Sequence, residues 1–200
     1  GNTGGILVFN MPGLSQQGAN IRVFNNKVIA NNHANFGAKG TPVASVPAGS
    51  GIVINSNDDI EVFDNEVRDN ATTNIIVSSV YSTGYKDSSA SPNFDPYPER
   101  IYIHNNTLSG GGDSPDGLDL KALKVAMYGL TGNFPDVLWD GYYNKERVVD
   151  GVKMGPQICL RNVSGVINAD GPGGYKNPSK DAKPFECDLP RLPAIDLKRG

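Results

Sequence analysis

The sequence predicts an all-β fold in which short parallel strands lie on one another in successive turns of a coil, a single-stranded parallel β-helix. The first observation is a phrase with aliphatic residues at positions one, three and eight and Asn at position six, which occurs at residues 21–28, 60–67 and 101–108. The second is a shorter, mainly aliphatic phrase that interleaves with it, at residues 5–8, 51–54, 74–77 and 117–120. Its shortest step, from Ile52 to Ile75, is 23 residues. Repeats of roughly 20–25 residues with tight corners are typical of this architecture.

Stacking the repeats places like side chains over like. The four predicted columns are Ile21/Ile60/Ile101, Val23/Val62/Ile103, Val28/Val67/Leu108 and Ile6/Ile52/Ile75/Leu118. β-Branched side chains suit parallel strands that are covered on both faces. Burying each one contributes about 1.5–3 kcal/mol, and a single turn cannot cover its own inner face, so we expect the stack to be the cooperative unit.

Two further columns are polar or aromatic. The first lies where the chain must turn, and it consists of Asn26, Asn65 and Asn106. Asn tolerates left-handed backbone angles and can bond a neighbouring amide, so we expect a structural ladder; a row of ligand-binding amides is the alternative. The second column consists of Phe24, Phe63 and His104. It predicts an aromatic stack, with His104 as a weak catalytic candidate.

Insertions and a tail interrupt the regular pattern. Residues 33–50 and 82–99 are rich in Gly, Pro, Ser and Ala, which predicts long corner loops. We expect the coil to occupy residues 1–170 and an irregular Pro-rich tail to occupy 171–200. Because the chain opens inside a repeat, an uncapped first turn would expose strand edges. We therefore expect the coil to be the C-terminal part of a longer one, or its first turn to dock on another surface.

The second half is less regular. Residues 120–127 contain good helix formers at helical spacing, which predicts a short helix or a loop packed on the coil. Residues 137–139 and 158–160 read as strands of the last turns. We expect Trp139 to lie in the core or to cap it. An exposed platform that stacks on sugars, made by Trp139 or by Tyr142 and Tyr143, is the alternative.

Cys159 and Cys187 are the two cysteines of the chain. In an exported protein such a pair predicts a disulfide, here one that fastens the tail to the last turn. Free thiols or metal ligands are the alternatives. The chain has two His and no Cys-x-x-Cys, which argues against a zinc site, and it has no Cys-x-x-Cys-His for covalent haem.

The repeats over about residues 4–120 resemble the bacterial right-handed parallel β-helix repeat, the fold of pectate lyases, polygalacturonases and alginate epimerases. Residues 135–141, 157–162 and 184–193 resemble the end of a group of exported bacterial β-helix proteins that are often encoded beside a di-haem c-type cytochrome. The resemblance implies a right-handed coil, a periplasmic or extracellular location and a c-type cytochrome as a protein partner. It implies no particular reaction.

Charge and composition limit the choice of partners. The net charge is −3 and no basic stripe is present, which excludes nucleic acid as a partner. No apolar run is long enough to span a membrane, so we do not expect a membrane-spanning protein. The 24 Gly and 14 Pro suit a coil with many corners.

One acidic cluster offers chemistry. Asp113, Asp116 and Asp119 could hold Ca²⁺, which prefers several oxygen ligands, and Lys121 could act as a base or electrophile. Asp116, Asp119 and Lys121 are thus weak catalytic candidates. A solvated Asp/Gly corner is the simpler interpretation. The partner motifs of polygalacturonases and the Asp-Pro-His-Asp signature of alginate epimerases are missing. The doublet Asp58-Asp59 precedes a strand and is interpreted as a turn.

Two functions remain open at this point. The first is an exported scaffold or binding module without a catalytic signature, acting on a protein partner or a glycan. The second is a carbohydrate-active enzyme, a lyase, hydrolase or epimerase for an acidic polysaccharide. Fold alone does not decide between them, so the sequence leaves open whether the protein is an enzyme.

Overall fold

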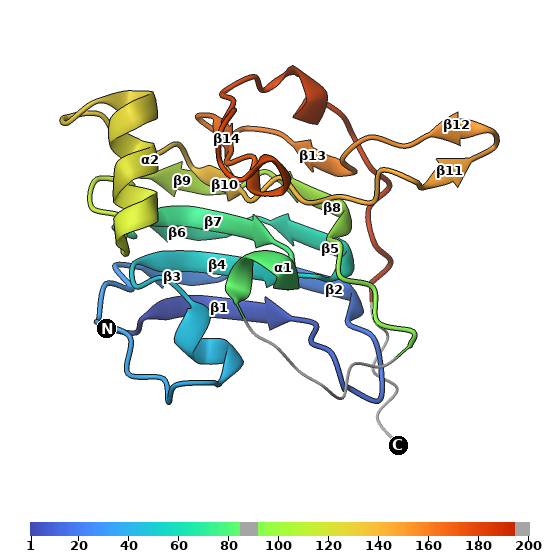
Figure 1. The fold of residues 1–200 in the computed structure, drawn as a ribbon, viewed down its shortest axis with the longest axis horizontal. Coiled ribbons are helices and arrows are strands. Elements are labelled where there is room, and N and C mark those ends of the chain that lie inside the picture. The colour runs from blue at the N-terminus through green and yellow to red at the C-terminus, as the bar shows by residue number, and fades with distance from the viewer. Residues whose placement is uncertain (85–91, 195–200) are drawn as a thin grey trace.

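The computed structural model describes residues 1–84 and 92–194, and its ribbon shows strands stacked above one another (Figure 1). Sheet A has the order β1 (Gly4–Phe9), β4 (Ser50–Asn55), β7 (Thr73–Ser78), β10 (Val137–Trp139), β14 (Val166–Asn168). Sheet B has the order β13 (Ile158–Leu160), β8 (Glu99–His104), β5 (Asp58–Phe63), β2 (Ala19–Phe24). Sheet C has the order β3 (Lys27–Ile29), β6 (Glu66–Arg68), β9 (Thr107–Ser109). All pairings within these three sheets are parallel.

The remaining elements lie outside these sheets. In the described part of the chain, the α-helices are α1 (Val80–Thr83) and α2 (Leu118–Tyr128). Short 3-10 helices span Pro42–Ser45, Gly171–Gly173 and Lys183–Phe185. The strands β11 (Val148–Val149) and β12 (Val152–Lys153) form an antiparallel hairpin that projects from the body (Figure 1). None of the helices in the described residues has the length and apolar character to cross a membrane.

The prediction of an all-β, single-stranded right-handed parallel β-helix is wrong. The structure is α/β, with 13% helix and 32% strand, and its strands are divided among several parallel sheets that lie side by side. The predictions of a right-handed parallel β-helix and of a pectate-lyase-like fold are therefore also wrong. The error is clearest at Leu118, which was expected to continue the column of Ile6, Ile52 and Ile75. It instead begins α2 and is 84% exposed, because helix formers dominate the segment that follows.

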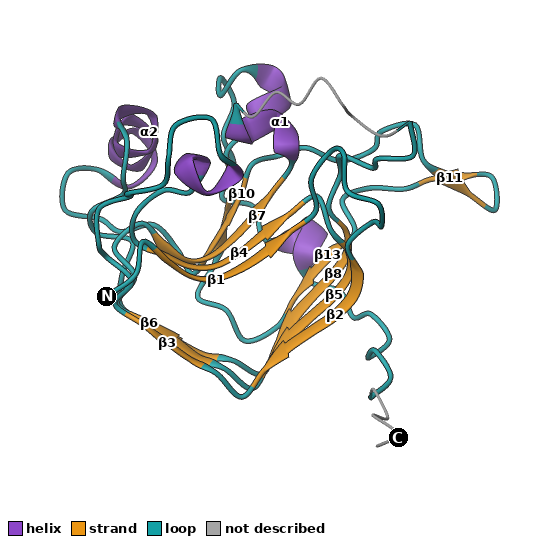
Figure 2. Ribbon diagram, turned by 90° about the horizontal axis from the view of Figure 1, so that it is seen from below, coloured by secondary structure: helices purple, strands orange, loops and turns teal. Residues whose placement is uncertain are grey.

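The register predicted for the remaining columns is confirmed. Ile21 pairs with Ile60 and Ile60 with Ile101, and the columns beginning at Val23, Val28 and Ile6 pair in the same way. The place expected for Leu118 beside Ile75 is taken by Val137 of β10. The inner faces of the three sheets surround one aliphatic core (Figure 2), in which Ile60 and Ile101 are at most 1% exposed. Alternating side chains therefore leave a second, outer face on each sheet.

Polar and aromatic columns stabilise the stack. The Asn65 Oδ1 atom accepts hydrogen bonds from the backbone N–H and the side-chain amide of Asn26, at 3.0 and 2.9 Å. Asn106 accepts the same pair from Asn65, so the structural ladder is confirmed. The left-handed residues lie one position earlier than the ladder, at Asn25, Asp64 and Asn105. The predicted aromatic stack is also confirmed, because the rings of Phe24, Phe63 and His104 are stacked in succession.

The second half contains most of the irregular structure. Trp139 is 2% exposed and packs against Phe185 and Tyr143, so it belongs to the core and is not an exposed platform. The loop predicted at residues 33–50 contains the helix Pro42–Ser45, and β4 begins at its end. Within the predicted loop 82–99, residues 85–91 lie outside the described residues. The predicted disulfide between Cys159 and Cys187 is confirmed, and it fastens the tail to β13.

Candidate functional site

The outer face of sheet A is apolar where three neighbouring strands meet. Val53 of β4, Ile76 of β7 and Leu138 of β10 lie in register and point away from the core, because their neighbours along each strand point into it. Helix α2 and α1 lie on this outer side of the sheet (Figure 2). The three side chains form the floor of a groove of about 750 Å³.

The walls of this groove come from segments far apart in the sequence. Helix α2 contributes Ala122, Leu123 and Ala126, and the small alanines leave space between the helix and the sheet. The opposite parts of the wall are Ser45–Pro47 before β4, Ser82 and Thr83 of α1, and the segment after β14 that contains Tyr175. The volume lies within the roughly 300–1,000 Å³ that is typical of small-molecule sites. The groove is therefore large enough to hold a ligand on a floor of rigid strands.

The charged groups that line the groove are mainly acidic. Among the described residues, they are the carboxylates of Asp116, Asp119 and Asp140 and the ammonium group of Lys176. Apolar surface with a few polar groups is the usual composition of a ligand site. The excess of carboxylates predicts that the groove attracts cations and repels anions.

Asp140 is the most buried of these acids. It directly follows β10, is 4% exposed, and accepts hydrogen bonds from the Ser79 N–H at 2.6 Å, the Ser82 hydroxyl at 2.7 Å and the Tyr142 N–H at 3.1 Å. Burial raises its pKa to about 6, although these hydrogen bonds oppose the rise. The carboxyl group therefore changes its charge between weakly acidic and neutral pH, next to an apolar floor.

Asp116 and Asp119 mark the N-terminal end of α2. The Asp116 carboxylate accepts hydrogen bonds from the Ala48 and Gly117 N–H groups, both at 2.9 Å, and so joins the helix start to the segment before β4. Asp119 lies in the first turn of α2. The pKa of Tyr175 is raised by partial burial and, to a lesser extent, by Tyr142, Asp140 and Asp119. Asp119, Asp140 and Tyr175 all line the groove.

The structure separates the other predicted site residues. Asp113 and Lys121 are exposed and do not line the groove. Within residues 1–84 and 92–194, the one group of three acids that could share a metal ion is Asp58, Asp95 and Glu99. The predicted Ca²⁺ ligands Asp113, Asp116 and Asp119 are therefore not brought together in this way. His104 lies on sheet B, where its Nε2 atom is 2.9 Å from Glu61 Oε1.

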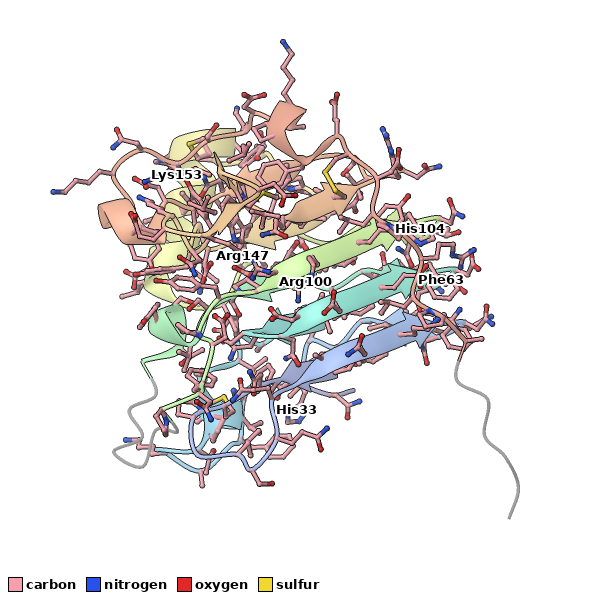
Figure 3. All side chains as sticks on the ribbon, turned by 90° about the vertical axis from the view of Figure 1, so that its right-hand side faces the viewer. His33, Phe63, Arg100, His104, Arg147 and Lys153 are labelled. Carbon is pink, nitrogen blue, oxygen red and sulfur yellow. A yellow bond between two sulfur atoms is a disulfide. The ribbon has the colours of Figure 1, made fainter. Side chains whose placement is uncertain are left out.

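The acids near Asp58 belong to an ion-pair network. Arg100 pairs with Asp58 at 3.4 Å and with Asp59 at 2.6 Å, while Arg147 pairs with Glu99. Figure 3 labels Arg100 and Arg147. Burial raises the pKa of Asp58 to about 6, Arg100 opposes this rise, and Asp95 adds to it. The network joins the starts of β5 and β8, and its two arginines pair with three of the acids, Asp58, Asp59 and Glu99. We do not assign it to a ligand. The doublet Asp58-Asp59, interpreted from sequence as a turn, forms the start of β5.

The sequence interpretation missed the floor of the groove and Asp140. A signal for the floor was present, since Gly51-Ile-Val-Ile54 and Asn74-Ile-Ile-Val77 are apolar at successive positions and not only at alternate ones. Continuous apolar strands are covered on both faces. The outer face therefore had to be covered by other parts of the chain or by a ligand. No local pattern marks Asp140.

No protein-family model, curated protein or solved structure matches this chain. The candidate site is therefore interpreted from its own geometry and charge.

Proposed function

We propose that the protein is a non-catalytic binding module whose groove on sheet A holds a small amphipathic molecule with an apolar body and a cationic head. The observation that supports this proposal is the combination of an apolar floor with a buried carboxylate, Asp140, beside it. Neither feature alone would define the ligand. Together they favour a molecule that carries both kinds of surface.

The apolar body is favoured by the floor and by α2. Val53, Ile76 and Leu138 are held by strand pairing, so their positions are fixed before a ligand arrives. These three side chains are at most 5% exposed, so a ligand would remove from water mainly the apolar surface of the exposed wall, such as that of Leu118 and Ala126, which contributes about 25 cal/mol for each Å². Since the floor is preformed, little of this gain is lost in ordering the protein.

The cationic head is favoured by the carboxylates. An ammonium group beside Asp140 would compensate a charge that is poorly solvated, and attraction between charges is stronger where water is largely excluded. Asp119, which also lines the groove, would add to the attraction. An anionic ligand would be repelled by the same groups. For this reason the groove gives no support to an enzyme that acts on an acidic polysaccharide.

The partner and location inferred from the sequence remain proposals. The Cys159–Cys187 disulfide supports a periplasmic or extracellular location, because disulfides persist in oxidising compartments. The c-type cytochrome is supported by the sequence resemblance alone. A protein partner could present the ligand or accept it without filling the groove itself.

A matched series of probes tests the proposal. Octylammonium, octanol and octanoate share one apolar chain and differ in the charge of the head, and their binding is measured by isothermal titration calorimetry at neutral pH below micelle-forming concentrations. We expect octylammonium to bind most tightly, octanol less tightly and octanoate least. Equal affinities, or the reverse order, would contradict the assignment of a cationic head.

A pair of variants on α2 tests where the probe binds. Ala126→Trp fills the groove and should abolish octylammonium binding, because Ala126 lines it. Val125→Trp is the matched control, since Val125 is 45% exposed on the same helix and does not line the groove. Equal loss of binding in both variants would show that the helix, and not the groove, is what the substitution disturbs.

A further inference from the structure

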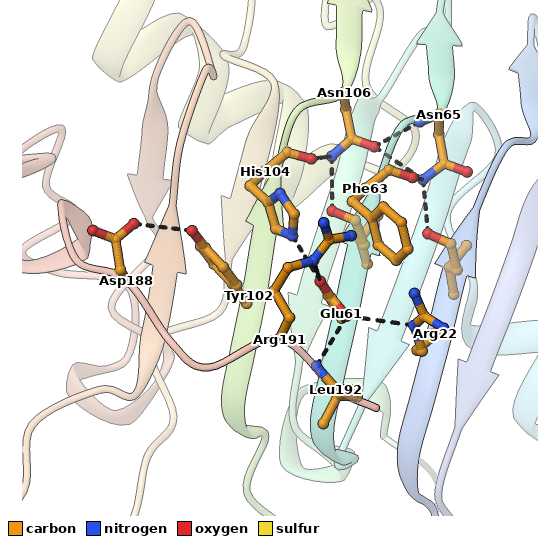
Figure 4. A network of polar contacts seen from close by, with 12 residues as sticks. Arg22, Glu61, Phe63, Asn65, Tyr102, His104, Asn106, Asp188, Arg191 and Leu192 are labelled. Carbon is orange, nitrogen blue, oxygen red and sulfur yellow. Dashed lines mark hydrogen bonds and ion pairs between the residues drawn. The ribbon is translucent and has the colours of Figure 1, made fainter. Parts of the chain in front are cut away.

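The outer face of sheet B carries polar and aromatic side chains in two parallel rows. One row contains Arg22, Glu61, Tyr102 and Cys159, and the other contains Phe24, Phe63 and His104. Arg161 follows β13 directly, and its N–H bonds to Ile103 of β8. The chain segment 187–192 crosses this face from β13 towards β5 (Figure 4). It has no strand or helix of its own. Side chains, and not a β-ladder, therefore hold the segment on the sheet.

Asp188 is the first contact after the disulfide. Its two carboxylate oxygens accept hydrogen bonds from Arg161 Nε at 2.9 Å and Nη2 at 2.7 Å, and the Tyr102 hydroxyl donates a third at 2.9 Å. The bonds from Arg161 and Tyr102 lower the pKa of Asp188 to about 2. A two-point contact between a guanidinium group and a carboxylate is specific in geometry as well as in charge.

Arg191 makes the second contact, at a buried carboxylate. Glu61 is 1% exposed and accepts hydrogen bonds from Arg191 Nε at 2.8 Å and from the Leu192 N–H at 3.1 Å. The Arg191 guanidinium group lies 4.5 Å from the centre of the Phe63 ring. Burial acts to raise the pKa of Glu61, but the hydrogen bonds from His104 and Arg191 outweigh it and keep the pKa below its usual value.

The receiving face is held in place by the sheet itself. His104 Nε2 lies 2.9 Å and Arg22 Nε 3.5 Å from the Glu61 carboxylate, so that group keeps two partners without the segment. The ring of Phe63 is stacked between those of Phe24 and His104, at 5.1 and 5.5 Å. Tyr102 lies on β8, and Arg161, directly after β13, is held to β8 by the hydrogen bond from its backbone N–H to the Ile103 carbonyl at 2.9 Å. The site would therefore keep its shape if the segment left.

We propose that this face is a binding site for an extended peptide with the pattern Asp-x-x-Arg, and that the chain's own residues 188–191 occupy it in cis. The partner is a protein that presents the same pattern. Release of the segment begins with thiol–disulfide exchange: a dithiol gives two electrons and two protons to the Cys159–Cys187 bond, leaving two thiols, and closes to its own disulfide. The peptide then takes the contacts that Asp188 and Arg191 made. This site lies on sheet B and is separate from the groove on sheet A.

The test uses the full chain with its segment freed. The freed variant carries Cys159→Ser, Cys187→Ser, Asp188→Ala and Arg191→Ala. The probe is a fluorescent peptide with the sequence of residues 186–194 and Cys187→Ser, and binding is followed by fluorescence anisotropy. We expect the peptide to bind the freed variant and not the oxidised wild-type protein. Substituting Asp188→Ala or Arg191→Ala in the peptide should weaken binding roughly tenfold to a hundredfold, because each removes charge-assisted hydrogen bonds.

A protein variant and a second measurement complete the test. Adding Arg161→Ala to the freed variant should weaken binding of the unmodified peptide. It should have little effect on binding of the peptide that already carries Asp188→Ala. If the freed variant does not fold by circular dichroism, the same peptides are added to wild-type protein reduced with dithiothreitol. Failure of the peptide to bind the folded freed variant or the reduced protein would overturn the proposal. So would equal binding of all peptides, or dimer formation in place of peptide binding.

Discussion

Asp140→Asn should remove a pH dependence of stability that a single buried carboxyl group causes. The pKa of Asp140 rises from 3.8, its ordinary value, to about 6 in the folded protein. The folded state therefore binds this proton more tightly than the unfolded state does. The stabilisation from the protonated group is fully present below pH 3.8 and is lost as the pH rises through 6.

The shift fixes the size of the effect. A rise of about 2 pH units corresponds to about 3 kcal/mol at 1.36 kcal/mol per unit. Asp140 is 4% exposed, so little of this is screened by solvent. An Asn at this position cannot ionise. Because the unfolded group is already partly ionised at pH 4, the wild-type protein should lose roughly 2 kcal/mol of unfolding free energy, relative to the variant, between pH 4 and pH 7.

Urea unfolding of both proteins at the two pH values measures this difference. The hydrogen bonds that Asn cannot make lower the stability of the variant at both pH values, so they cancel in the comparison. Asp113→Asn is the control, since Asp113 is exposed and does not line the groove. A gap between wild type and Asp140→Asn that stays the same at pH 4 and pH 7 would refute the assignment of a raised pKa to this group.

The fold itself makes two further predictions, both measured as urea-unfolding free energies. Ile101 is 0% exposed, so Ile101→Ala should lower the unfolding free energy by about 2–5 kcal/mol. Leu118 is 84% exposed, so Leu118→Ala should change it by less than about 0.5 kcal/mol. Similar losses in the two variants would contradict the placement of the core. Replacing Cys159 and Cys187 by Ser should cost about 3–4 kcal/mol, because the disulfide closes a loop with a sequence separation of 28; an unchanged stability would show that the tail is held without it.

The strand register could be predicted from the sequence because its signal is local and repeated. Ile60 and Ile101 occupy the same position in two copies of one sequence motif. Because the two copies pair as parallel strands in register, these residues lie side by side. The disulfide was predictable because the chain has one pair of cysteines. The fold class could not be predicted in the same way. Leu118 fits the strand motif by residue type, but the residues after it favour a helix, and packing decides between the two.

The candidate site was harder to predict than the fold. The carboxylates of Asp116 and Asp119 were identified from sequence, but their neighbours in the groove come from β4, β7, β10 and the segment after β14. The raised pKa of Asp140 comes from burial, and its hydrogen-bond partners Ser79 and Ser82 lie about 60 residues earlier in the chain. Such contacts depend on which segments cover sheet A. A pattern within one stretch of sequence does not contain them.

Mapping the bound probe is the most direct test of the proposed function. Backbone amide chemical shifts are recorded by NMR while octylammonium is titrated into the wild-type protein at neutral pH. The changes should be concentrated at Ile76, Leu138, Ala122 and Ala126, which line the groove from the sheet and from α2. Saturable changes at these residues would support a ligand site over sheet A. Changes confined to sheet B, or the absence of saturable changes, would contradict it.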